Sequence, residues 1–307
     1  MFVYRKGEFM SVLVCENISK NKKNTEIIHS FSYNFLDNQI YAVIGNDTKK
    51  QNELLNLICG KEKPSTGVVY LDGEPLYNNN LMSERLCYIS NETSFPGFLK
   101  VEQIFSMMSE IFPKWDNSFA FELVTHFEID LKNKYERLNK KKKSLLNAIL
   151  GLASLANITI FEHPIDNIES KERYDFFNFL YKNHVRYPRT YIISTSYIDE
   201  IDYLVNKVLF LDKGRLFAHY SVDEIKDNFT YLSGKTEVLK SLINGVKIVG
   251  VEERGKTLTV CIRQKLSKDD IRKYQKYLIK ISEVPISSVF IYLINLRQIK
   301  EKTYGVE

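Results

Sequence analysis

The sequence predicts an α/β protein built on a parallel sheet, followed by a smaller α+β domain. Short apolar runs rich in β-branched residues have the length of buried strands, and segments with helical spacing separate them. Strands that alternate with helices form parallel sheets through right-handed crossovers. Near residue 230 the alternation gives way to a helix, a hairpin and further helices. We therefore expect domains at 11–228 and 229–307.

Length and composition agree with a two-domain globular chain. The 307 residues exceed one typical domain, and 44% hydrophobic with 26% charged residues is ordinary for a folded protein. The 43 basic and 38 acidic residues give a net charge of +5, spread along the sequence. Nucleic-acid binding usually requires a concentrated basic patch, so no nucleic-acid partner is expected.

The cysteines and the apolar runs bear on the compartment. Four cysteines are far apart and show no C-x-x-C spacing, which predicts buried thiols in a reducing compartment: Cys15, Cys59, Cys87 and Cys261. The first residues lack the apolar segment of a secretory signal, and Met10 is an expected alternative start to Met1. Polar residues interrupt the longest uncharged run, 144–161, so we expect no transmembrane segment.

The first eighty residues predict an antiparallel strand pair and then a strand, turn and helix. Residues 12–17 and 26–35 alternate between apolar and polar, as paired strands do. Residues 40–60 follow with IYAVIGNDTKKQNELLNLICG, in which a short strand ends at Gly45 and apolar residues take helical spacing from Glu53. A turn at 63–67 and a strand at 68–71 complete this part.

This strand, turn and helix have the frame of a phosphate-binding loop, G-x-x-x-x-G-K-S/T, without its chemistry. Aligned on Gly45, Lys50 replaces the second glycine, Gln51 the lysine and Asn52 the hydroxyl. Charge-assisted hydrogen bonds contribute about 1.5–3 kcal/mol each, so both losses together predict roughly a thousandfold weaker phosphate binding. Any phosphate contacts would come from the loop residues Gly45, Asn46, Asp47, Thr48, Lys49, Lys50, Gln51, Asn52 and Glu53.

Helical spacing continues over 101–155, interrupted at 113–117, which predicts a helical subdomain at about 92–155. Its last helix opens with Lys140 to Lys143, whose charges oppose the helix dipole, although a solvated charge run is the default interpretation. The continuation LLNAILGLASLA is apolar all round and must be buried.

The remaining elements follow from the same periodicities. They are strands at 158–161 and 191–194, helices at 170–183 and 199–204, and a hairpin at 208–211 and 216–220. In the second domain we expect a helix near 237–244, a hairpin at 246–252 and 257–263, a helix capped by Ser267 with Asp270, and a last helix after Pro285.

Six segments in this order resemble the nucleotide-binding subunit of an ABC transporter, particularly the kind that serves ABC-2-type exporters. The degenerate P-loop precedes YLDGEPL, a Q-loop-like CYISNET and a signature-like LNKKKKSLLNAILGLA. A Walker B and D-loop segment, ITIFEHPIDNIES, a switch segment, YIISTSYIDEID, and a closing hairpin, LFLDKGRLFAHYSVDEI, follow. The resemblance covers 11–228 well and the C-terminal tail loosely.

The resemblance implies site roles position by position, and most side chains differ from the family pattern. Glu162 stands for the metal-binding aspartate and is the candidate metal ligand. His163 stands for the catalytic glutamate and could act as a base, although a partly buried loop residue is the favoured interpretation. The other substituted positions are Ser196 (switch histidine), Asn91 (Q-loop glutamine), Glu169 (D-loop aspartate), and Asn139, Lys140 and Lys141 (signature). The aromatic that stacks on adenine near Lys22 is absent.

The resemblance implies ATP and Mg²⁺ as cofactors, and the substitutions predict weak or absent binding. We expect a catalytically degenerate subunit that supports an ABC-2-type permease at the inner face of the cell membrane. It would pair with a second ATP-binding subunit as a homodimer or heterodimer. Two alternatives stay open: an active ATPase that uses Lys49 or Lys50 with Glu162 and His163, and a soluble ABC-fold protein with a binding role outside transport.

Overall fold

The computed structural model describes residues 11–23, 25–79, 84–90, 92–166 and 168–304. The chain divides into two compact units, Met1–His219 and Tyr220–Glu307, and the division falls inside strand β10 (Arg215–Ser221). The units are described separately. The boundary expected between residues 228 and 229 stays a prediction.

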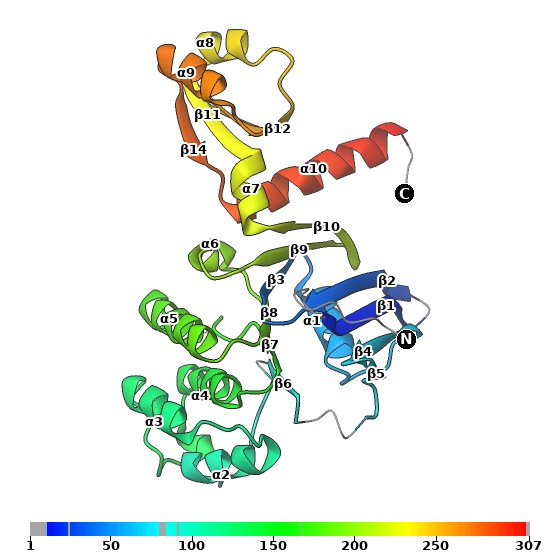
Figure 1. Cartoon of the computed structure of the whole chain (residues 1–307), viewed down its shortest axis with the longest axis vertical. Coiled ribbons are helices and arrows are strands. Elements are labelled where there is room, and N and C mark those ends of the chain that lie inside the picture. Colours follow the sequence, from blue (N-terminus) through cyan, green and yellow to red (C-terminus); the bar gives the residue numbers. More distant parts are fainter. Residues whose placement is uncertain (1–10, 24, 80–83, 91, 167, 305–307) are drawn as a thin grey trace, which may run out of the picture. The chain divides into compact units, whose positions relative to one another are not determined.

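A six-stranded sheet forms the centre of the first unit (Figure 1). Its order is β10-β9-β3-β8-β7-β6, with β3 at Ile40–Gly45, β6 at Leu86–Ser90, β7 at Ile158–Glu162, β8 at Thr190–Ser194 and β9 at Lys207–Asp212. The pairs β3–β8, β3–β9, β7–β8 and β6–β7 are parallel, which confirms the predicted parallel sheet. Every residue of β7 and β8 is buried, as in a parallel sheet covered on both faces.

A second, antiparallel sheet lies in the same unit and has the order β2-β1-β4-β5. Its strands are β1 Ser11–Lys22, β2 Thr25–Leu36, β4 Thr66–Leu71 and β5 Glu74–Pro75. The antiparallel pairing of β1 with β2 confirms the prediction from their alternation. Side chains of this sheet share a core cluster with helix α1 (Thr48–Ile58), including the fully buried Phe31, Phe35 and Leu54.

Helices complete the first unit and follow the predicted segments closely. They are α2 Val101–Ile111, α3 Asn117–His126, a 3₁₀ helix at Tyr135–Arg137, α4 Lys140–Ala153, α5 Ser170–Arg186 and α6 Ile198–Ile201. Every residue of α4 from Ser144 to Ala153 is buried, as its apolar sequence predicts. Helix α6 is shorter than the predicted 199–204, because an i to i+3 bond from Leu204 N to Ile201 O makes a turn there.

The second unit has a β-α-β-β-α-β core of the ferredoxin-like kind. Its elements run β11 Phe229–Lys235, α8 Thr236–Leu242, β12 Ile248–Arg254, β13 Thr257–Arg263, α9 Lys268–Lys276 and β14 Lys280–Glu283. The sheet order is β12-β13-β11-β14, with antiparallel pairs throughout. Helices α7 (Val222–Asn228) and α10 (Ile286–Tyr304) flank this core in the sequence.

The hairpin and the Ser267 capping box with Asp270 are confirmed, whereas strands β11 and β14 were not predicted. The helix expected near 237–244 ends at Leu242. Among the described residues, no helix has both the length and the apolar content needed to cross a membrane.

Candidate nucleotide-binding site

The loop between β3 and α1 is shorter than the sequence analysis predicted. Strand β3 ends at Gly45 and α1 begins at Thr48, so Asn46 and Asp47 alone connect them. The helix starts at Thr48 rather than near Glu53 because Asp47 is an N-cap residue with extended backbone, whose carboxylate accepts a hydrogen bond from Lys50 N at 3.2 Å. The helix N-terminus, which favours anions, therefore has a carboxylate of its own chain.

Gln51, at the position of the phosphate lysine, is turned into the fold. Its side chain is 3% exposed, and Nε2 donates to the Val43 carbonyl at 3.4 Å. A Cβ at Gly45 would lie 3.3 Å from Gln51 Cγ and 3.1 Å from Leu211 O. The close packing of these groups gives Gly45 a role in the core that does not depend on a phosphate.

Glu53 is held by Lys22, in the region where the adenine-stacking aromatic is absent. Glu53 Oε2 lies 2.5 Å from Lys22 Nζ, and the same ammonium lies 3.3 Å from Glu62 Oε1. The hydrogen bond to Glu53 raises the pKa of Lys22 above its usual value, against the opposing effect of desolvation. Glu53 is 6% exposed, so this pair links β1 to a buried part of α1.

Glu162, the candidate metal ligand, ends strand β7 and is buried. The Tyr88 hydroxyl, from the adjacent strand β6, donates to Glu162 Oε2 and also lies 3.0 Å from Asn56 Oδ1. Burial raises the pKa of the Glu162 carboxyl, while His163 and Lys61 act in the opposite direction. Tyr88 was not predicted as a site residue, although the alternation of β6 could have placed it on the face of the sheet that meets α1.

His163 follows Glu162 in a left-handed conformation, with φ of 46°. Its backbone N–H lies 3.2 Å from both Ser194 O and Ser194 Oγ, and its ring Nδ1 lies 3.1 Å from Asp166 Oδ2. The residue is 3% exposed, which is deeper than the partly buried loop position expected. Among the described residues, neither ring nitrogen makes a well-aligned hydrogen bond. Ser196, the switch position, is exposed beyond the end of β8.

The lysine run that opens α4 is largely engaged within the chain. Asn139 caps the helix by accepting from Lys142 N at 2.8 Å, and Lys142 Nζ donates to Glu128 O at 2.6 Å. Lys141 Nζ lies 3.2 Å from Glu169 and 2.5 Å from Glu172, whereas Lys143 Nζ lies 4.8 Å from the Tyr135 ring centroid. Lys140 is exposed and has no partner among the described residues. The default interpretation, a solvated charge run, therefore holds for Lys140 only.

Known proteins with similar sequences and structures come from one class. The chain is 21% identical over 212 residues to the ABC transporter ATP-binding protein YtrB of Bacillus subtilis, a match that covers 69% of this chain and 73% of that protein. A solved structure of the ATP-binding subunit of an ABC transporter superposes with a TM-score of 0.63 at 14% identity, over 70% of this chain and 92% of that one. The chain has the fold of an ABC transporter ATP-binding subunit.

The ABC fold confirms the predicted fold class. No protein-family model matches the chain. A mouse relative, the ABC-type organic anion transporter ABCA8B, is 25% identical over 220 residues, which cover 65% of this chain and 13% of that protein. The chain therefore matches a small part of the long mouse transporter and most of the bacterial ATP-binding protein.

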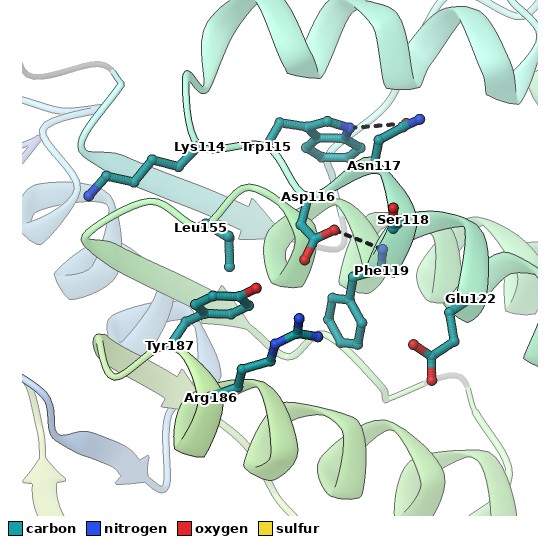
Figure 2. A pocket seen from close by; sticks show the side chains of 10 residues that line it. All are labelled: Lys114, Trp115, Asp116, Asn117, Ser118, Phe119, Glu122, Leu155, Arg186 and Tyr187. Atoms are coloured by element: carbon teal, nitrogen blue, oxygen red, sulfur yellow. Dashed lines mark hydrogen bonds between the residues drawn. The ribbon is translucent and has the colours of Figure 1, made fainter.

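The cavity described next does not coincide with the predicted site residues. A cavity of about 490 Å³ is lined by none of the predicted site residues and lies among Trp115, Phe119, Leu155, Arg186 and Tyr187 (Figure 2). In the described ranges, no group of three or more histidine, cysteine or acidic side chains is arranged to hold a metal ion. Asn91, the predicted Q-loop residue, lies outside the described residues.

Proposed function

We propose that this chain is a catalytically degenerate ABC transporter ATP-binding subunit, which acts as a structural or regulatory partner of a membrane permease. The observation that carries the proposal is a set of intramolecular contacts: the groups at the positions expected to bind MgATP already bond to other groups of the same chain. Asp47 caps the helix that would face phosphate, Gln51 bonds to a backbone carbonyl, and Glu162 is bonded to Tyr88.

The residues at these positions do not fit MgATP. A neutral, buried amide at Gln51 supplies no charge to a phosphate, and the Tyr88 hydroxyl competes with a metal ion for Oε2 of the buried Glu162. Asn52 replaces the hydroxyl that would hold Mg²⁺. These contacts support the proposal that ATP binding is weak or absent.

The helical subdomain supports a permease as the partner. It keeps a buried core in α2 to α4 while it exposes large apolar side chains at Phe98 (68%), Met107 (41%) and Ile111 (48%). Apolar groups exposed in this way are typical of contact surfaces. We propose an ABC-2-type permease at the cytoplasmic face of the membrane, together with a second ATP-binding subunit in a homodimer or heterodimer.

An active ATPase is the second candidate, and the ring of His163 favours it. The ring is buried, and Nδ1 lies 3.1 Å from Asp166 Oδ2, a carboxylate that could orient the imidazole as a general base. Lys49 and Lys50, in the first turn of α1, form no ion pair among the described residues and would have to replace the phosphate lysine.

Calorimetric titration of the purified chain with ATP and Mg²⁺ distinguishes the two candidates. We expect no binding in the micromolar range. Micromolar affinity that is lost in Lys50→Ala or Gln51→Ala would overturn the degenerate subunit and favour the active ATPase. Co-purification with a membrane permease then tests the partner, and recovery of the chain without one would favour a binding role outside transport.

A further inference from the structure

The geometry points to Tyr88 as an internal ligand that occupies the position of a metal ion on Glu162 and keeps the nucleotide site closed. This inference rests on the proposed function, since it names the contact that regulates the same site. Tyr88 lies in the Q-loop-like segment CYISNET, but its role is identified only by the position of its hydroxyl between Glu162 and Asn56.

Tyr88 joins three elements at the end of the central sheet. It lies on β6 in parallel register with Ile160 of β7, so its side chain can reach Glu162 at the end of the neighbouring strand. Its hydroxyl is also 3.0 Å from Asn56 of α1. A hydroxyl has one proton, and both Asn56 Oδ1 and Glu162 Oε2 are acceptors, so they share the Tyr88 hydroxyl as a donor, with the charged carboxylate as the stronger acceptor. The Lys61 ammonium lies 5.6 Å from the Tyr88 ring centroid and holds the ring from a third side.

Tyr88 competes with a cation for the same carboxylate oxygen. A divalent cation needs carboxylate lone pairs directed at it, and the Tyr88 hydroxyl already occupies one side of Glu162 Oε2. The Tyr88 hydroxyl directs its proton at Glu162 Oε2, and Glu162 is 6% exposed, so water does not compete for that oxygen. A metal that binds on this side of Oε2 would have to displace the phenol.

Restoring the P-loop side chains alone should therefore be insufficient. Gln51→Lys with Asn52→Ser supplies the phosphate lysine and the hydroxyl but leaves Tyr88 on Glu162. Adding Tyr88→Phe removes the hydroxyl, keeps the ring and its packing, and frees the carboxylate. The two changes act on different ligands of the same bound species, so their effects can be separated.

The experiment compares Q51K/N52S with Q51K/N52S/Y88F by calorimetric titration with ATP, once with Mg²⁺ and once with EDTA. We expect the triple variant to bind ATP at least tenfold more tightly with Mg²⁺, because one charge-assisted hydrogen bond no longer competes. In EDTA the two variants should bind equally. Adding Glu162→Gln to the triple variant should abolish the gain.

Tyr70→Phe in the same double variant is the matched control, since the Tyr70 hydroxyl makes no hydrogen bond among the described residues. Fluorescence of Trp115, the one tryptophan of the chain, verifies that each variant is folded. Equal affinities of the double and triple variants with Mg²⁺, or no binding by a folded triple variant, would overturn the inference. Tight MgATP binding by the unaltered chain would instead refute the proposed function.

Discussion

Lys141 in the first turn of α4 lies 2.5 Å from Glu172 in the first turn of α5. The carboxylate of Glu172 neutralises the positive charge of Lys141 at the start of α4. A lysine at a helix N-terminus opposes the dipole, whereas Glu172 is favourable at the start of α5 and neutralises Lys141 from outside α4. The ion pair thus explains how α4 can open with lysines where the family has glycines.

Replacing Lys141 should lower stability in a pH-dependent way. The hydrogen bond to Lys141 lowers the pKa of Glu172 below its usual 4.5. A carboxyl with a lowered pKa contributes stability above the unfolded value, and this contribution is lost as pH falls through the folded pKa. Urea denaturation should show Lys141→Ala less stable than the unaltered chain at neutral pH, with the difference shrinking below about pH 4.

Lys140→Ala is the control for this experiment, because Lys140 is exposed and unpaired among the described residues. It should leave stability nearly unchanged at both pH values, since an exposed charge contributes little. An equal loss in both variants would show that the ion pair has no special role.

The cap on α1 gives a second prediction. Asp47→Ala removes the acceptor for Lys50 N and should destabilise the chain by about 1 kcal/mol. Asp47→Asn keeps a good cap without the charge and should stay close to the unaltered chain. Chemical denaturation of both variants measures this. If Asp47→Asn lost as much stability as Asp47→Ala, the carboxylate charge rather than the cap would be responsible.

The sequence predicted elements whose signal is local, and it failed where contacts join distant segments. Helix α4 was predicted because its apolar residues continue all round, and the Ser267 cap because Ser and Asp stand three apart. The start of α1 was misplaced although Asp47 is a good N-cap, because residues 48–52 are polar and the apolar residues take helical spacing only from Glu53. The capping signal was present, but the apolar periodicity outweighed it.

Other misses have a different cause. Strand β11 contains Ser233 and Gly234, which weaken a strand pattern, yet it lies inside the sheet between β13 and β14. Strand β14 is four residues long and has charged ends, so its pairing with β11 decides its structure. The bond from Tyr88 to Glu162 joins residues 74 apart in the sequence, which no local pattern can show.

Two glycines with similar backbone angles should respond differently to alanine. Gly214 has φ of 83° and Gly73 has φ of 86°, so alanine is strained at both. A Cβ at Gly214 would lie 1.9 Å from Ile27 O, whereas one at Gly73 meets nothing within 4 Å. We expect a loss of about 1–2 kcal/mol for Gly73→Ala and of about 3 kcal/mol or more for Gly214→Ala.

Thermal denaturation checks this pair. The larger loss at Gly214 follows because the strand β2 backbone must move, and His29 N donates to Gly214 O at 3.0 Å in the same place. Equal losses at both glycines would mean that backbone strain alone determines the cost and that the contact with Ile27 relaxes freely.

The cysteines give the last prediction, since their reactivity reports burial directly. Burial raises the pKa of Cys59 to about 12, of Cys87 to about 11 and of Cys261 to about 12, and it raises the pKa of Cys15 as well. The thiolate is the reacting form, so a pKa near 12 instead of 9 lowers its fraction roughly a thousandfold at pH 8. Iodoacetamide should therefore label the native chain very slowly and all four cysteines rapidly in urea, as counted by intact mass.

Cys59 tests this prediction most severely, because it is only half-buried and its Sγ donates to Asn56 O at 3.4 Å. Rapid labelling of one site in the native chain, assigned to Cys59 by peptide mapping, would contradict this order of reactivity and would show that the end of α1 opens, next to the Tyr88 contact on Asn56.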